Sequence, residues 1–133
     1  MKKNTLLALL TVIAAGCIFA ETLTIQIENV DIGKGLVHIA LYDNEKSFPK
    51  DEDYTFATNT ESVAKAVTVT MTDLPKGVYA AAIFQDKNRN GRIDTVLGIP
   101  TEKYGFSNNT MTPSWGKNSF AINGDMSIVV KLR

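Results

Sequence analysis

The fold is decided by residues 23–28, LTIQIE, in which apolar and polar side chains alternate with a period of two. The three aliphatic residues fall on one side of an extended chain and the polar residues on the other. This alternation is typical of a β-strand that buries one face. The segments Ser62–Thr72 and Ser127–Leu132 repeat it. The sequence therefore predicts strands near the start, in the middle and at the end of one domain.

Two further segments, Val37–Tyr42 and Val78–Phe84, are more continuously apolar, which is typical of central strands covered on both faces. Weaker strand patterns occur near Tyr54–Ala57 and Ser119–Ile122. No segment longer than about ten residues has helical spacing with caps. The predicted fold is all-β, an antiparallel β-sandwich of about seven strands with one long ordered loop.

Turn residues separate these segments. Gly33-Lys34-Gly35 lies between the first two predicted strands at a distance typical of a hairpin, and Leu74-Pro75-Lys76-Gly77 has the composition of a tight turn. Two longer connections remain. Asn44–Asp53 is polar and is predicted to be solvated, whereas Lys87–Asn118 is much longer. Loops of that length in compact domains are usually functional, so we expect the functional site there.

Residues 1–20 have the pattern of a secretory signal peptide. Lys2 and Lys3 provide a basic start, Leu6–Ile13 is an apolar run, and small residues follow up to Ala20. The apolar run is too short for a transmembrane helix, which needs about 20 apolar residues. We therefore expect an exported protein, periplasmic or secreted, with no transmembrane segment.

Two processing sites compete within this segment. Cleavage before Glu21 would release a soluble domain of residues 21–133, and we favour this interpretation. The alternative is a lipid anchor at Cys17, because Ala14-Ala15-Gly16-Cys17 is similar to a loose lipobox. The lipobox lacks the preferred Leu, and the first strand pattern begins too soon after Cys17 to leave much tether.

The charge balance and the scarcity of certain residues exclude several functions. The 133 residues contain 14 basic and 14 acidic side chains. Because the predicted signal peptide holds two lysines and no acid, the remaining domain is slightly acidic. Nucleic-acid binding needs a concentrated basic face and is not predicted. One His and one Cys in the whole chain argue against catalysis and favour oxygen ligands, hence calcium before zinc, for any metal.

A loop with calcium-type spacing occupies residues 86–94, DKNRNGRID. Oxygen-bearing side chains stand at its first, third, fifth and ninth positions, and Gly stands at the sixth. In a tightly coiled loop alternate side chains point inward, so hard oxygen donors can surround a cation while Gly takes the sharp bend. The predicted metal ligands are Asp86, Asn88, Asn90, Arg92 through its backbone carbonyl, Asp94 and Glu102.

This loop differs from an EF-hand. An EF-hand has a bidentate Glu at position 12, where this chain has Leu97, and the preceding segment Val78–Gln85 has a strand pattern. Glu102 is the candidate for the missing carboxylate, with water as the alternative. We expect weak calcium binding, with a Kd on the order of 10⁻⁴ to 10⁻³ M. The competing interpretation is a metal-free turn, because Asn90-Gly91 is a common hairpin signal.

Three linked motifs stand out in the second half of the chain: Leu74–Ala80, Asp86–Asp94 and Leu97–Asn109. With them the chain resembles an exported bacterial family, domain of unknown function 2141, over about Leu23 to Leu132. The resemblance implies a secreted or periplasmic β-sandwich, transthyretin-like or immunoglobulin-like, with no established activity. It also implies that the 86–94 loop and the segment after it lie together. The family often has His directly before the first Asp, where this chain has Gln85, which argues against a His-assisted site.

An aromatic and amide-rich stretch after the loop is the candidate ligand-binding surface. Aromatic faces and amide groups suit sugar rings or peptide segments. The alternative is that these residues close the end of the sandwich and form a turn. The predicted ligand-binding residues are Tyr104, Asn108, Asn109 and Trp115. His38 is expected on the outer face of a strand, and the acids of Asp51–Asp53 are expected to be solvated.

Together these patterns predict a non-enzymatic exported module whose calcium-type loop organises a carbohydrate- or peptide-binding surface. One alternative is a structural or accessory envelope module that binds no ligand. The other is a hydrolase in which the loop cation activates water, which needs an open coordination position and a nearby base.

The processing hypothesis is tested by mass spectrometry of the mature protein. We expect a chain that begins at Glu21 and carries no lipid, because Ala20 provides the small residue before the cleavage point. A diacylglyceryl group on Cys17 would contradict this expectation and establish the anchored form.

Overall fold

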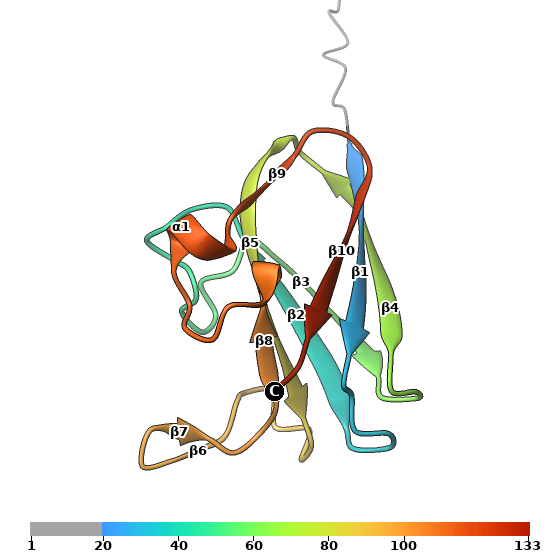
Figure 1. Ribbon diagram of the computed structural model, residues 1–133, viewed down its shortest axis with the longest axis vertical. Helices are drawn as coiled ribbons and strands as arrows, with labels where there is room; N and C mark the ends of the chain where they lie inside the picture. The colour runs from blue at the N-terminus through green and yellow to red at the C-terminus, as the bar shows by residue number, and fades with distance from the viewer. Residues whose placement is uncertain (1–19) are drawn as a thin grey trace, which may run out of the picture.

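The computed structural model describes residues 20–133. Residues 1–19, which include Cys17, lie outside the described residues. Only Ala20 of the predicted signal peptide is described. Two main β-sheets pack face to face (Figure 1), which confirms the predicted all-β, sandwich-like fold. Within the described part of the chain, no helix is long and apolar enough to cross a membrane.

Sheet A has three strands, in the order β10-β1-β4. Their bounds are Met126–Lys131 for β10, Glu21–Glu28 for β1 and Val67–Leu74 for β4. The alternation that opens the domain is reproduced, since Leu23, Ile25 and Ile27 are fully buried. β1 pairs with β4 in antiparallel and with β10 in parallel orientation. The prediction of an antiparallel sandwich is therefore wrong for this one pair.

Sheet B has the order β3-β2-β5-β8, and β9 pairs with the first three residues of β5. The inner faces of the two sheets enclose a common aliphatic core, in which each buried side chain contributes about 1.5–3 kcal/mol. The strands predicted as central, β2 and β5, do occupy the middle of sheet B. The bounds are Phe56–Glu61 for β3, Leu36–Tyr42 for β2, Gly77–Asp86 for β5, Tyr104–Phe106 for β8 and Phe120–Ile122 for β9.

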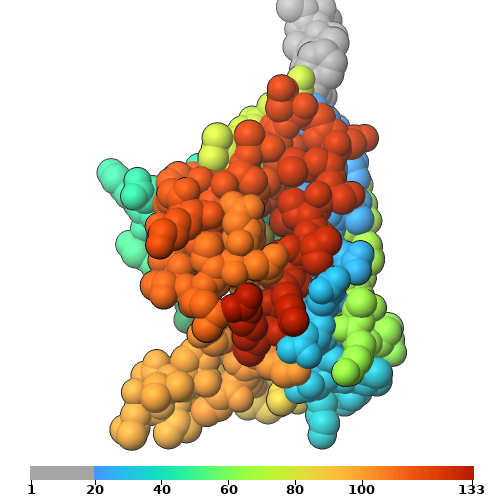
Figure 2. Space-filling model, viewed as in Figure 1, coloured from blue at the N-terminus to red at the C-terminus, as the bar shows by residue number. Residues whose placement is uncertain are grey.

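The long connection after β5 is ordered by short elements that the sequence pattern did not predict. A small hairpin of β6 and β7 stands away from the body of the molecule (Figure 2). β8 then returns to sheet B, and two short helices follow. The bounds are Thr95–Val96 for β6, Ile99–Pro100 for β7, Ser107–Asn109 for the 3₁₀ helix η1 and Trp115–Asn118 for α1.

Two predictions about connections were wrong. Gly33-Lys34-Gly35 does not close a hairpin, because β1 belongs to sheet A and β2 to sheet B. The strand predicted over Ser62–Thr72 begins only at Val67, and Val63 is 75% exposed. Residues 62–66 carry the chain from β3 in one sheet to β4 in the other. Local spacing and alternation do not distinguish a hairpin from an arch between sheets.

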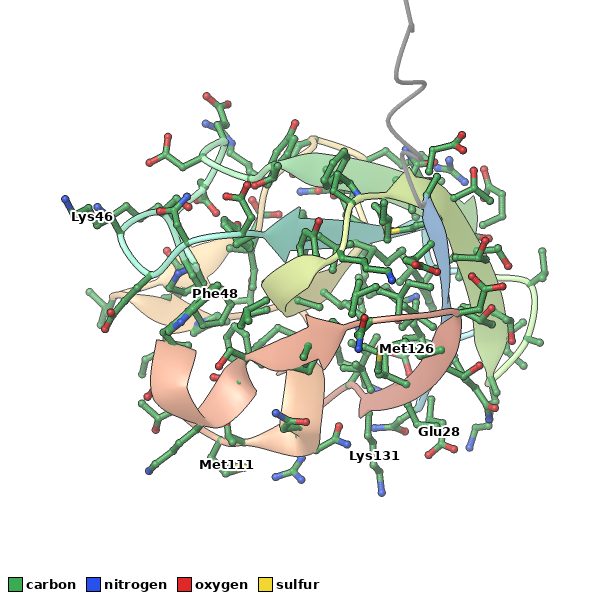
Figure 3. All side chains as sticks on the ribbon, turned by 90° about the horizontal axis from the view of Figure 1, so that it is seen from above. Glu28, Lys46, Phe48, Met111, Met126 and Lys131 are labelled. Atoms are coloured by element: carbon green, nitrogen blue, oxygen red, sulfur yellow. The ribbon has the colours of Figure 1, made fainter. Side chains whose placement is uncertain are left out.

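The connection Asn44–Asp53, predicted to be solvated, contains a buried anchor. Phe48 is 7% exposed and its ring centroid lies 5.4 Å from that of Tyr42, 6.1 Å from Phe106 and 6.2 Å from Trp115. Figure 3 shows Phe48 on the inner side of this loop next to α1, with Lys46 at the outer edge. The loop and α1 therefore cover part of the outer face of sheet B.

The start of β2 approaches the end of β5 so closely that only glycine fits. Gly35 has a φ of +75°, and a Cβ atom there would lie 2.0 Å from the carbonyl oxygen of Asp86. Gly33 has a similar φ of +72°, but a Cβ atom there would have no neighbour within 4 Å. Substitutions at the two glycines can therefore be compared: both introduce backbone strain, but only the one at Gly35 adds steric overlap.

We expect Gly35→Ala to destabilise the protein more than the matched control Gly33→Ala. Both variants force alanine into the left-handed region, at about 1–2 kcal/mol. Gly35→Ala adds an overlap with backbone, which costs about 1–3 kcal/mol more. Urea denaturation measures both losses in free energy of unfolding, and equal losses would contradict the close approach.

Candidate functional site

Asp86, the last residue of β5, is fully buried and organises the loop that follows it. Its Oδ1 accepts a hydrogen bond from the Asn90 backbone N–H at 3.1 Å, and its Oδ2 accepts one from the Gly91 N–H at 2.8 Å. The same Oδ2 lies 3.0 Å from Nε2 of His38. The carboxylate therefore joins the 86–94 loop to strand β2.

The other oxygen-bearing side chains of the loop gather on Asp94. The side-chain amides of Asn90 and Asn88 both donate to its carboxylate, the first at 2.7 Å. The Asn90 hydrogen bond is the main cause that holds the pKa of Asp94 below its usual range. Positive φ angles occur at Arg89 and Gly91 and not at Asn90. The loop is therefore not a type I′ turn centred on Asn90-Gly91, which would need positive φ at both residues.

Glu102 faces this loop from the segment between β7 and β8. It is 6% exposed, and its two carboxylate oxygens accept the backbone N–H groups of Lys87 and Asp94, each at 3.3 Å. Burial is the main cause that raises the pKa of Glu102 above its usual value, and the negative charges of Asp94 and Asp86 add to it. Three carboxylates thus lie close enough to influence one another.

Three basic residues near these acids pair with carboxylates outside the loop. Nζ of Lys87 and Nζ of Lys103 lie 3.0 and 2.8 Å from the carboxylate of Asp31. The guanidinium of Arg89 forms a bidentate pair with Glu61 at the end of β3, at 2.8 and 3.1 Å. These three cations therefore attach the loop to its surroundings, while Arg92 lies close enough to Asp94 to help lower its pKa.

A cation at this place would require a local rearrangement. Within residues 20–133, no three His, Cys, Asp or Glu side chains form a group that could hold a metal ion. Asn88 and Asn90 direct their NH₂ groups to Asp94. Rotation of each terminal amide would exchange its nitrogen for its oxygen and provide two neutral oxygen ligands. The Arg92 side chain is exposed, as expected if only its carbonyl were to bind.

The bond between His38 and Asp86 was not predicted from the sequence. His38 lies on the outer face of β2, as expected, directly opposite Phe84 of β5, and the two rings stack with centroids 4.9 Å apart. Its bond to Asp86 joins residues far apart in sequence. Period-two spacing could place His38 on the outer face, but only the β2–β5 register brings it beside Asp86.

The four predicted ligand-binding residues do not form one surface. The Asn108 amide donates to the carbonyls of Lys117 and Ser119. The Asn109 side chain donates to the carbonyl of Val129 and accepts the N–H of Lys131, so it covers the edge of β10 as a neighbouring strand would. These two amides therefore hold the end of the sandwich together.

Trp115 and Tyr104 both pack against the aromatic cluster on the outer face of sheet B. Trp115 packs against Phe48 in the cluster that covers part of sheet B. Tyr104 lines a groove of about 830 Å³ over the outer face of sheet B, beside Phe84, Ala82, Ala40 and His38. The sequence did not predict this groove. Of the four residues, Tyr104 alone lines it.

The fold and this geometry define an all-β sandwich with a polar loop at the end of a central strand and a groove on one outer face. The chain belongs to the family described as "Uncharacterized protein conserved in bacteria (DUF2141)", which it matches over residues 25–129. The resemblance found in the sequence motifs is thereby confirmed. No curated protein and no solved structure shows significant similarity to the chain.

The ion cluster around Asp31 predicts a pH-dependent part of the stability. Lys103 first, and then Lys87, hold the pKa of Asp31 below its ordinary value of 3.8. Because the pKa is lower in the folded state, the stabilisation is present above pH 3.8 and is lost as the pH falls through the folded-state value.

We therefore expect Asp31→Asn to lower the free energy of unfolding at about pH 7 by ~0.2–1 kcal/mol, the range of partly exposed pairs. The difference from wild type should shrink at about pH 2, because stability that depends on a lowered pKa is lost progressively as the pH falls below 3.8. Urea denaturation at both pH values measures it. A difference of the same size at both would contradict the electrostatic origin.

Proposed function

We propose that the protein is an exported, non-enzymatic β-sandwich module whose 86–94 loop, with Glu102, binds calcium and thereby organises a carbohydrate- or peptide-binding surface. The single observation that carries the proposal is the convergence of Asp86, Asp94 and Glu102 on one loop while the neighbouring lysines pair elsewhere. Concentrated carboxylates with amide oxygens within reach are the ligands that calcium prefers.

The position of the loop supports its link to a binding surface. Gly91, Arg92 and Ile93 of the loop form part of the wall of the sheet B groove. A cation held by Asp86 and Asp94 would restrain the short segment between them. The cation would thereby help to hold this wall of the groove in place.

Ser107 and His38, which could be considered as a nucleophile and a base, both make structural contacts. These contacts support a non-enzymatic role. The Ser107 hydroxyl is buried, donates to the carbonyl of Asn118 and accepts the N–H of Ala81. His38 is stacked on Phe84 and bonded to Asp86. Both side chains are held in structural contacts. The N-terminal pattern of a signal peptide supports export.

A structural module without a ligand is the second candidate, and a different observation favours it. The polar groups of the loop already satisfy one another, since Asp86 accepts two loop N–H groups and Asp94 accepts two Asn amides. Among the described residues, no buried side-chain nitrogen or oxygen lacks a partner. A loop of this kind can also serve as a rigid closure of the sandwich.

Thermal denaturation with calcium and with a chelator separates the two candidates. With a Kd of about 1 mM, calcium at about 10 mM should stabilise the native state by about 1.4 kcal/mol, which raises Tm by several degrees. Asp94→Asn should reduce this shift, because it removes a charge from the loop. The matched control Asp73→Asn, on β4 in sheet A, should keep it.

The absence of a shift at about 10 mM calcium would remove the calcium proposal and favour the structural candidate. An equal loss of the shift in both variants would mean that calcium acts on the protein through overall charge and not at the loop.

A further inference from the structure

The groove over sheet B is open because its floor is made of alanine. In the register of sheet B, Ala57, Ala40 and Ala82 lie side by side on β3, β2 and β5, and Phe106 of β8 ends the row. The neighbouring row consists of Asn59, His38, Phe84 and Tyr104. A trough therefore crosses the strands, with small residues beneath it and larger, mostly aromatic residues along one side.

Two loops raise walls on either side of this trough. Pro49, Asp51 and Tyr54 of the 43–55 connection line it on one side, and Arg92 and Ile93 line it on the other. Figure 2 shows the recess between the β6–β7 hairpin and the region of α1. The volume of about 830 Å³ lies within the range of about 300–1,000 Å³ that is usual for small-molecule sites.

We infer that this groove binds a short, neutral oligosaccharide. His38 and Phe84 stack on each other, so the faces between them are covered. Their remaining surface and Tyr104 offer apolar contact to the C–H surface of a sugar ring. The rim adds Asp51, Glu52, Asn59 and Arg92, which supply the hydrogen-bond donors and acceptors that hydroxyl groups need. The rim carries the two acids Asp51 and Glu52 and the one cation Arg92, so an anionic ligand is disfavoured.

The backbone of the floor favours a sugar over an extended peptide. β2 is paired with β3 and β5, and β5 is paired with β2 and β8, so the middle strands of the floor have used their backbone groups. Peptides that add to a sheet gain affinity from free backbone groups at an edge. The central strands β2 and β5 therefore offer a peptide no free backbone groups for strand addition, whereas sugar hydroxyls are satisfied by side chains alone.

This inference rests on the proposed function for one wall only, because Arg92 and Ile93 belong to the 86–94 loop. The floor and the 43–55 wall do not depend on a cation. A failure of calcium binding and a failure of sugar binding can therefore be told apart.

Isothermal titration of the mature protein with cellotetraose, chitotetraose and maltotetraose tests the inference, with and without calcium. We expect at least one of the three to bind. We expect Ala82→Leu, which fills the floor, to weaken that binding at least about tenfold, or about 1.4 kcal/mol. The matched control Ala121→Leu, at an exposed position on β9, should bind within about twofold of wild type.

Amide chemical shifts of the wild-type protein provide a measurement that does not depend on a variant's folding. Sugar binding should move the signals of Ala40, Ala82 and Phe84. Binding by none of the three sugars, binding unaffected by Ala82→Leu, shifts confined to another face, or peptide binding in the groove would each overturn the inference. Sugar binding that ignores calcium would support the groove and count against the proposed role of the cation.

Discussion

The buried carboxylate of Asp86 is the constraint on which the rest of the site depends. A fully buried charge is costly unless hydrogen bonds compensate it, and here two backbone N–H groups and His38 do so. Because both N–H groups belong to the next few residues, the chain must turn at once after β5. The carbonyl of the same residue approaches Gly35 so closely that β2 can begin only with glycine there. One residue thus determines the end of β5, the start of β2 and the path of the loop.

Acids and lysines next to each other in sequence act at different places. Asp86 and Glu102 face the loop, while Lys87 and Lys103 face Asp31 on the other side. The side chain of Gln85, one position before Asp86 on β5, points to residues 31–34 in the connection between β1 and β2. Its amide donates to the carbonyls of Asp31 and Lys34 and accepts the N–H of Asp31.

The three bonds of Gln85 also bear on the His that the family resemblance leads us to expect at this position. A neutral His has one donor and one acceptor, so it could make two of these three bonds. In this chain Gln85 stabilises the connection from β1 in sheet A to β2 in sheet B. Asp86, which begins the polar loop, stands on the opposite face of β5.

The sequence predicted those parts of the structure that depend on near neighbours. Alternation in 23–28 gave β1, continuous apolar runs gave β2 and β5, and the oxygen spacing of 86–94 identified a compact polar loop. The errors concern partners. Gly33–Gly35 has the same spacing whether it closes a hairpin or carries the chain between sheets, and only the choice of partner strands decides.

Contacts between side chains far apart in the sequence could not be predicted either. Asn109 replaces a strand beside β10, and His38 reaches Asp86 through the β2–β5 register. Neither contact leaves a periodic pattern, because each depends on which chain segment comes to lie opposite. Phe48, alone among polar neighbours, gave no signal of the cluster that it anchors.

Small residues on the outer face of sheet B explain both its covered and its open half. Ala80 lies beneath Tyr42, Phe48 and Phe106, and its small side chain lets these rings approach the sheet. Ala40 and Ala82 are equally small, but the chain after β5 turns outward into the β6–β7 hairpin and leaves them partly exposed. Larger aliphatic residues at these positions would have exposed a wide apolar surface to water. Such exposure costs about 25 cal/mol of free energy per Å². Alanine keeps that cost low, so an open groove can persist on a central pair of strands without endangering the fold.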